Sequence, residues 1–246
     1  MLLEKPIGAA RKPPAQGITL GVDTSAECAS VALVRDGELL SECFCHGGRQ
    51  HSASLLPMAE QCLRQAGLTI GQVDRFAVTN GPGSFTGIRI GASAVKGMAQ
   101  ALDKLCAGVS TLVTMAAMAE GLSGILCCAM DARRGQVYAA LFEVCGGAPR
   151  RLTEDAALPI AALEEILVAV AGEGTPVFFL GDGAELCHNT MRPREHWRLA
   201  PAAIRQQRGY GAILASREED YRPAAELMVR YLRPSQAERE RAEKEH

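Results

Sequence analysis

Two segments of the chain, 108 residues apart, each contain an apolar strand that ends at an aspartate and precedes a second apolar strand. The first contains Val22-Asp23-Thr24-Ser25, and the second contains Met130-Asp131-Ala132-Arg133. At the same offset, the apolar run 30–34 aligns with the apolar run 138–142. A repeat of roughly 100 residues is too long for the stacked units of a solenoid. The pattern therefore predicts two related α/β halves.

The elements in the first half alternate between the two hydrophobic periods. Apolar runs predict strands over 18–23, 28–34 and 39–44, with Asp36-Gly37 as a hairpin turn. Apolar spacings of three and four predict amphipathic helices over 51–66 and 88–102, and a strand over 75–79 lies between them. We therefore expect two α/β subdomains, 17–109 and 110–234, flanked by a flexible leader, 1–16, and a charged tail, 235–246.

Charge and cysteine content exclude several classes of protein. The 26 lysines and arginines nearly balance the 28 aspartates and glutamates, which disfavours a chain that binds nucleic acid by itself. The nine cysteines form no C-x-x-C pair, so we expect buried free thiols in a reducing compartment. The sequence shows no signal-peptide pattern and no apolar run of the ~18 residues that span a bilayer. The expected location is the cytoplasm, without membrane contact.

A glycine-rich loop connects the predicted strand 75–79 to the helix that follows it, a position where many proteins bind phosphate. Its glycines read G-x-G-x-x-x-G instead of the dinucleotide pattern G-x-G-x-x-G, and Ile88-Arg89 stands where a P-loop has Lys and Ser or Thr. A structural role is favoured, in which the glycines permit positive φ angles and Ser84 or Thr86 caps the helix. The loop consists of Gly81, Pro82, Gly83, Ser84, Phe85, Thr86 and Gly87.

The two predicted helices of the first half are apolar around much of their circumference, which favours a partner surface as well as a core. The small residues of the second helix would permit close approach of another helix. The predicted interface consists of Leu55, Leu56, Met58, Ala59, Cys62, Gly91, Ala94, Val95 and Met98.

Catalytic patterns are scarce. His46 and His51 are five residues apart, so they do not form the i, i+4 pair that holds a metal on one helix face. Asp23 and Asp131 have the chemistry to hold a hydrated metal ion, but both are explained as turn residues that follow a strand. We predict no catalytic residue, no metal and no cofactor.

The motifs given above, together with Gln136-Val137-Tyr138 after Asp131 and Tyr231-Leu232-Arg233 near the end, closely resemble the TsaB family, also called YeaZ. The resemblance implies a duplicated actin-like, ribonuclease-H-like (ASKHA) fold. It also implies a non-catalytic accessory role in forming N6-threonylcarbamoyladenosine beside the tRNA anticodon. In this superfamily Asp23, Asp131, Gly181 and Gly183 stand at degenerate phosphate-binding turns.

The same resemblance implies the partners. The two helices would pair with those of the transferase TsaD, or with a second copy of this chain, and the ATPase TsaE would join the complex. Contact with tRNA would occur only within that complex. The metal-binding histidine pair of TsaD is not carried over, because Leu55 stands four positions after His51.

Two other interpretations remain open from the sequence. One is an enzyme, either a metallo-glycopeptidase or an actin-like kinase, which would bind metal or ATP as the isolated chain. The other is a stand-alone homodimeric regulatory protein with no part in tRNA modification.

Overall fold

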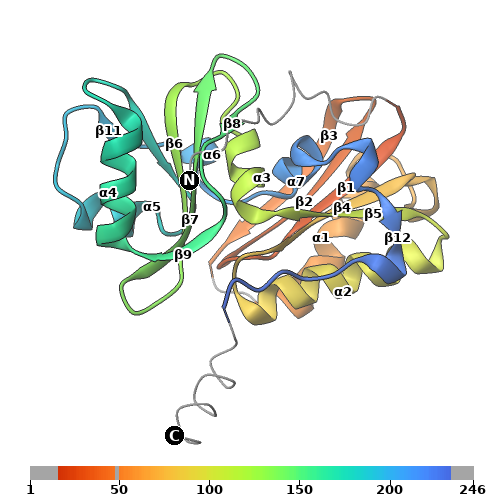
Figure 1. The fold of residues 1–246 in the computed structure, drawn as a ribbon. Helices are drawn as coiled ribbons and strands as arrows, with labels where there is room; N and C mark the ends of the chain where they lie inside the picture. The colour runs from red at the N-terminus through yellow and green to blue at the C-terminus, as the bar shows by residue number, and fades with distance from the viewer. Residues whose placement is uncertain (1–15, 48–49, 234–246) are drawn as a thin grey trace, which may run out of the picture.

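The computed structural model describes residues 16–47 and 50–233. These residues form two mixed β-sheets, and helices pack on the outer faces of the sheets and between them (Figure 1). The predicted charged tail and the predicted leader, apart from Gln16, lie outside the described residues.

The strands of the first sheet are β1 (Ile18–Asp23), β2 (Cys28–Arg35), β3 (Glu38–His46), β4 (Arg75–Gly81), β5 (Leu105–Ser110) and β12 (Arg222–Pro223). Their order across the sheet is β12-β5-β4-β1-β2-β3. β2 runs antiparallel to β1 and β3, whereas β4 runs parallel to β1 and β5. β12 adds an antiparallel edge beside β5.

The strands of the second sheet are β6 (Ser123–Asp131), β7 (Gln136–Cys145), β8 (Arg150–Arg151), β9 (Ala156–Pro159), β10 (Val177–Leu180) and β11 (Trp197–Leu199). Their order is β11-β10-β6-β7-β8, and β9 also pairs with β7. β7 runs antiparallel to β6, whereas β10 runs parallel to β6 and β11.

The two sheets therefore repeat one topology. In each, the first strand pairs antiparallel with the second and parallel with a later strand, so β1, β2 and β4 correspond to β6, β7 and β10. Asp23 and Asp131 are the last residues of the equivalent strands β1 and β6. This confirms the predicted duplicated, ribonuclease-H-like α/β fold and its 108-residue offset.

Helices cover both sheets. α1 (His51–Gln65) and α2 (Phe85–Ala101) pack on one face of the first sheet, while α4 (Ile160–Ala171) and α5 (Ala184–Thr190) pack on the second (Figure 1). Between the sheets lie α3 (Thr111–Ala117) and α7 (Gly209–Ala215), which contact each other. A short helix α6 (Ala202–Arg205) and the 3-10 turns Ile70–Gln72, Glu218–Asp220 and Ala224–Glu226 complete the secondary structure of the described residues.

The chain returns to the first sheet near its end, which the predicted boundary of 110–234 does not anticipate. α7 packs on β1, β2 and β4, and β12 pairs with β5. The approach is close enough that a Cβ on Gly21 would lie 2.2 Å from the carbonyl oxygen of Gly209. We call the first sheet with α1, α2, α7 and β12 the first lobe, and the second sheet with α4, α5 and α6 the second lobe. The second lobe is thus inserted into the first.

All nine cysteines are free thiols. Six are buried, as predicted, but Cys43 and Cys45 are half-buried and Cys145, at the end of β7, is exposed. None of the helices in residues 16–47 and 50–233 has the length and apolarity needed to cross a membrane.

Candidate functional site

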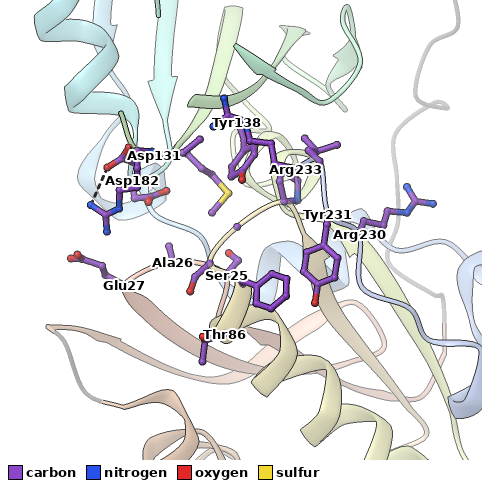
Figure 2. A pocket seen from close by; sticks show the side chains of 18 of the residues that line it. Ser25, Ala26, Glu27, Thr86, Asp131, Tyr138, Asp182, Arg230, Tyr231 and Arg233 are labelled. Carbon is purple, nitrogen blue, oxygen red and sulfur yellow. Dashed lines mark hydrogen bonds and ion pairs between the residues drawn. The ribbon is translucent and has the colours of Figure 1, made fainter. Parts of the chain in front are cut away.

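A cavity of about 630 Å³ lies between the two lobes, where β1, β4 and β6 end (Figure 2). In sheets with parallel strands, ligands bind preferentially beyond the carboxyl ends of those strands. The turn after β1, the glycine-rich loop after β4, the end of β6 and the turn after β10 all contribute to its lining. These four turns hold the glycine-rich loop and the positions that the family resemblance marks as degenerate phosphate-binding turns. We call this space the interlobe cavity.

Asp23 does not reach the interlobe cavity, because its side chain is fully buried beneath the turn after β1. The backbone N–H and the hydroxyl of Ser25 donate hydrogen bonds to Asp23 Oδ1 at 3.0 and 2.9 Å. Burial raises the pKa of Asp23, and the hydrogen bonds from Ser25 partly oppose this rise. Asp23 therefore shapes the turn, as an aspartate that follows a strand commonly does.

Asp131 lines the interlobe cavity, but its carboxylate is already engaged. The backbone N–H of Arg133 donates to Asp131 Oδ1 at 2.7 Å, and the guanidinium of Arg133 lies 3.2 Å from Oδ2. Arg133 and Arg134 both have positive φ angles, 67° and 56°, which turn the chain tightly between β6 and β7. A carboxylate paired with a guanidinium has less residual charge for a hydrated cation.

Asp182 faces the same cavity from the turn after β10 (Figure 2). Burial raises its pKa to about 6, and the nearby Asp131 adds to the rise. The side-chain amide of Gln207, which is fully buried, donates to Asp182 Oδ1 at 2.7 Å. The predicted glycines on either side have a packing role: a Cβ on Gly181 would lie 2.1 Å from the carbonyl oxygen of Ala129, and one on Gly183 would press against Met130.

The glycine-rich loop 81–87 begins α2 and borders the cavity through Pro82, Gly83, Ser84, Phe85 and Thr86. The structure selects Ser84 as the helix cap, since its hydroxyl accepts a hydrogen bond from the Gly87 backbone at 3.2 Å. Thr86 is exposed instead.

Close packing explains the glycines at both ends of this loop. A Cβ on Gly81 would lie 2.2 Å from the carbonyl oxygen of Arg230, and one on Gly87 would lie 2.1 Å from that of Thr24. The loop is therefore held by contacts with two distant segments.

Five of the nine predicted interface residues are buried in the core of the first lobe, so their side chains do not lie on the surface of this chain. They are Leu55, Ala59, Cys62, Gly91 and Val95. Each faces the first sheet or the neighbouring helix, because a helix that packs on a sheet buries one full side. A bulky residue at Gly91 would meet the hydroxyl of Thr24 and disturb the fold before any partner.

The other four interface residues do reach the surface. Leu56 is 55% exposed, whereas Met58, Ala94 and Met98 are half-buried. Ala94 and Met98 are one helical turn apart, so they share a stripe on α2. Helix α1 begins at His51, as expected, and it contains Pro57.

His51 belongs to no metal-binding cluster in the described part of the chain. Its Nε2 lies 2.8 Å from the carbonyl oxygen of Ala26, and residues 16–47 and 50–233 contain no group of three or more His, Cys, Asp or Glu that could hold a metal.

A segment that the sequence had not singled out as a site crosses the cavity mouth. Residues 227–233, which we call the strap, bind the first lobe at Asn80: the backbone N–H of Arg230 donates to the Asn80 carbonyl at 2.7 Å, and the Asn80 amide donates to the Met228 carbonyl at 3.0 Å. Arg230, Tyr231, Leu232 and Arg233 all line the cavity. The sequence analysis had used Tyr231-Leu232-Arg233 as part of the family resemblance, without assigning it to a site.

Comparison with known proteins gives a consistent result. Residues 46–229 match the family described as TsaD, tRNA N6-adenosine threonylcarbamoyltransferase. The tRNA threonylcarbamoyladenosine biosynthesis protein TsaB of Bacillus subtilis (strain 168) is 32% identical over 70% of this chain and 73% of its own length. TsaB of Escherichia coli (strain K12) is 39% identical over 50% of this chain and 54% of its own.

A solved structure agrees with these sequence matches. YeaZ from Pseudomonas aeruginosa superimposes with a TM-score of 0.73 at 29% identity, covering 88% of this chain and 100% of that one. Together with the repeated topology and the loop 81–87, these matches establish that the chain belongs to the TsaB (YeaZ) family.

Proposed function

We propose that this chain is a non-catalytic accessory subunit in the formation of tRNA N6-threonylcarbamoyladenosine, which binds and activates the transferase TsaD together with TsaE. Its TsaB relatives are named for the biosynthesis of this modified nucleoside, which supports a role in that modification. A second copy of the chain would use the same helices, tRNA would be contacted only within the complex, and the complex would act in the cytoplasm.

The state of the interlobe cavity supports the absence of catalysis. Asp131 is paired with Arg133, Asp182 is bonded to Gln207, and Asp23 is buried away from the cavity. The loop 81–87 carries no lysine to hold a nucleotide phosphate. An enzyme that hydrolyses ATP needs free groups to hold the metal and to stabilise the charge of the transferring phosphoryl group.

The observation that carries the proposed binding role is the surface of α1 and α2. Leu56 is 55% exposed on α1, and Ala94 and Met98 form a partly exposed stripe on α2. Apolar and small side chains at helix surfaces permit close packing with another pair of helices. We infer that TsaD, or a second copy of this chain, covers this surface, which we call the helix face.

The test is reconstitution of threonylcarbamoyl transfer from threonine, bicarbonate and ATP onto tRNA, with purified TsaC, TsaD and TsaE, with and without this chain. The proposal expects modification only when the chain is present, and no ATP hydrolysis by the chain alone. Full modification without the chain would contradict the accessory role.

One further control separates the alternatives. Metal-dependent peptidase or kinase activity of the isolated chain would favour an enzyme. A stable homodimer in sedimentation that TsaD does not dissociate would favour a stand-alone regulatory protein.

A further inference from the structure

The strap brings aromatic and cationic groups together at the mouth of the interlobe cavity. The rings of Phe85 and Tyr231 stack with centroids 4.6 Å apart, and the guanidinium of Arg89 lies 3.8 Å from the centroid of Phe85. Arg89 Nε also donates a hydrogen bond to the Tyr231 hydroxyl at 2.6 Å. Because Tyr231 is still 39% exposed, this ordered stack leaves aromatic surface free.

Two guanidinium groups of the strap have no partner among the residues that the structure describes. Arg230 and Arg233 both line the cavity, yet their side chains form no ion pair or hydrogen bond within residues 16–47 and 50–233. Arg133, which also lines the cavity, is paired with Asp131, and Arg89 donates a hydrogen bond to Tyr231. Unpaired guanidiniums beside an exposed aromatic ring offer both phosphate contacts and a stacking surface.

Among the described residues, the unpaired cations of the cavity lie apart from its carboxylates. Arg230, Tyr231 and Arg233 lie on one side, and Asp131 and Asp182 lie on the other (Figure 2). An anion would therefore be held at the strap, because Arg133 on the opposite side is already paired with Asp131. This arrangement does not suit a nucleoside triphosphate placed deep in the cavity, but it suits a nucleic-acid backbone that passes along the strap.

We propose that the strap and Phe85 form a binding site for a single-stranded RNA segment. Arg230 and Arg233 contact successive phosphates, and an unpaired base stacks on the exposed surface of Tyr231. The site rests on the proposed function, which supplies an RNA substrate, and it assigns this chain a direct contact with that substrate. The net charge of −2 makes the contact weak for the isolated chain, so it contributes mainly beside other subunits.

The experiment measures fluorescence anisotropy of the full chain with a labelled single-stranded RNA of about twelve nucleotides, a length that spans one site of this kind. Wild type should bind with a dissociation constant of roughly 10⁻⁴ to 10⁻⁶ M and with a clear salt dependence. The double variant R230Q/R233Q should lower the slope of log K against log salt by about 1.4, since each single-strand phosphate contact contributes about 0.7.

Tyr231 is tested separately from the charges. Tyr231→Ala should weaken binding about fivefold or more, and Tyr231→Phe, which keeps the ring, should restore most of it. The matched control is R194Q/R198Q, which also removes two positive charges. These two arginines are exposed at the far end of the second lobe, where they lie over Trp197 and Phe178. The RNA affinity of this control should stay within about twofold of wild type.

The inference would be overturned if R194Q/R198Q and R230Q/R233Q lost RNA affinity equally, or if Tyr231→Ala bound RNA as tightly as wild type. It would also be overturned if strap variants kept normal RNA affinity but lost affinity for TsaD. That result would make the strap a protein-binding surface. Modification assays on the same variants separate the two proposals. If wild type is required for modification but the strap variants bind RNA normally, the proposed function stands and the RNA site falls.

Discussion

The hydroxyl of Thr24 donates a hydrogen bond to the backbone carbonyl of Gly87 at 2.8 Å, so the turn after β1 is tied to the first turn of α2. The contact is tight in both directions, because a Cβ on Gly87 would lie 2.1 Å from the Thr24 carbonyl oxygen. The two segments that border the interlobe cavity on the first lobe therefore behave as one unit.

Gly87→Ala should lower the free energy of unfolding by about 2 kcal/mol, the usual cost of overpacking a tight contact. Helix propensity alone predicts the opposite sign, because alanine is favoured over glycine inside a helix by about 1 kcal/mol. Gly97→Ala is the matched control on the same helix, where a new Cβ has open space and should stabilise. Urea unfolding measures both, and equal stability of the two variants would contradict the contact.

Leu56→Asp should weaken binding to TsaD about tenfold, because it places a charge on the exposed helix face. The monomer should keep its thermal stability, since Leu56 is already 55% exposed. Val168→Asp, at a 39% exposed position on α4, introduces the same charge on the second lobe and should leave the affinity unchanged. Calorimetric titration of each variant decides between a helix-face interface and one elsewhere.

Because of Asp182, the free energy of unfolding should fall as the pH rises through about 6. Burial raises the pKa of Asp182 from 3.8 to about 6, so the folded state favours the protonated carboxyl group. The stabilisation from this group is complete only at pH values below its pKa in the unfolded chain. Ionisation at higher pH then removes up to about 3 kcal/mol, since each pKa unit corresponds to about 1.4 kcal/mol.

Unfolding of wild type and Asp182→Asn across this range gives the test. Asparagine keeps the acceptor oxygen that Gln207 uses at 2.7 Å, so the variant should lose only the titration. The difference in free energy of unfolding between wild type and variant should therefore change between about pH 4 and pH 7, and it should be constant above about pH 7. A constant difference would show that Asp182 titrates normally.

Cys145 should be the first thiol to react with a water-soluble reagent, because it is exposed whereas six of the others are buried. Burial also raises the pKa of Cys62 and Cys187 to about 12, which keeps these thiols protonated and unreactive. Cys145→Ser should remove the fast phase of labelling, and Cys43→Ser should leave it intact. A fast phase that survives Cys145→Ser would contradict the exposure of this residue.

The repeat could be predicted from the sequence because strand-ending aspartates are local features. Asp23 and Asp131 each follow an apolar run, and the structure places them at the ends of equivalent strands. The sequence also predicted that Ser84 or Thr86 caps the helix, because a hydroxyl before a helix has few other partners. The structure shows that Ser84 is the cap.

The division of the helix residues between core and surface could not be predicted. Periodicity shows that Leu55 and Leu56 both belong to a broad apolar arc, but only the position of the sheet decides that Leu55 is buried and Leu56 is exposed. The strap was missed for a related reason: Tyr231 acquires its stacking partner Phe85 from a segment far away in the sequence.

The return of α7 and β12 to the first sheet sets the order in which the chain can be completed during synthesis. Residues 16–110 contain five strands of the first sheet, but the face formed by Ala32, Val34 and Ala77 stays uncovered until Ala212 and Ile213 arrive. Residues 16–110 therefore leave the ribosome with an unprotected apolar face and an open β5 edge, and both are covered only after residues 209–223 have been translated.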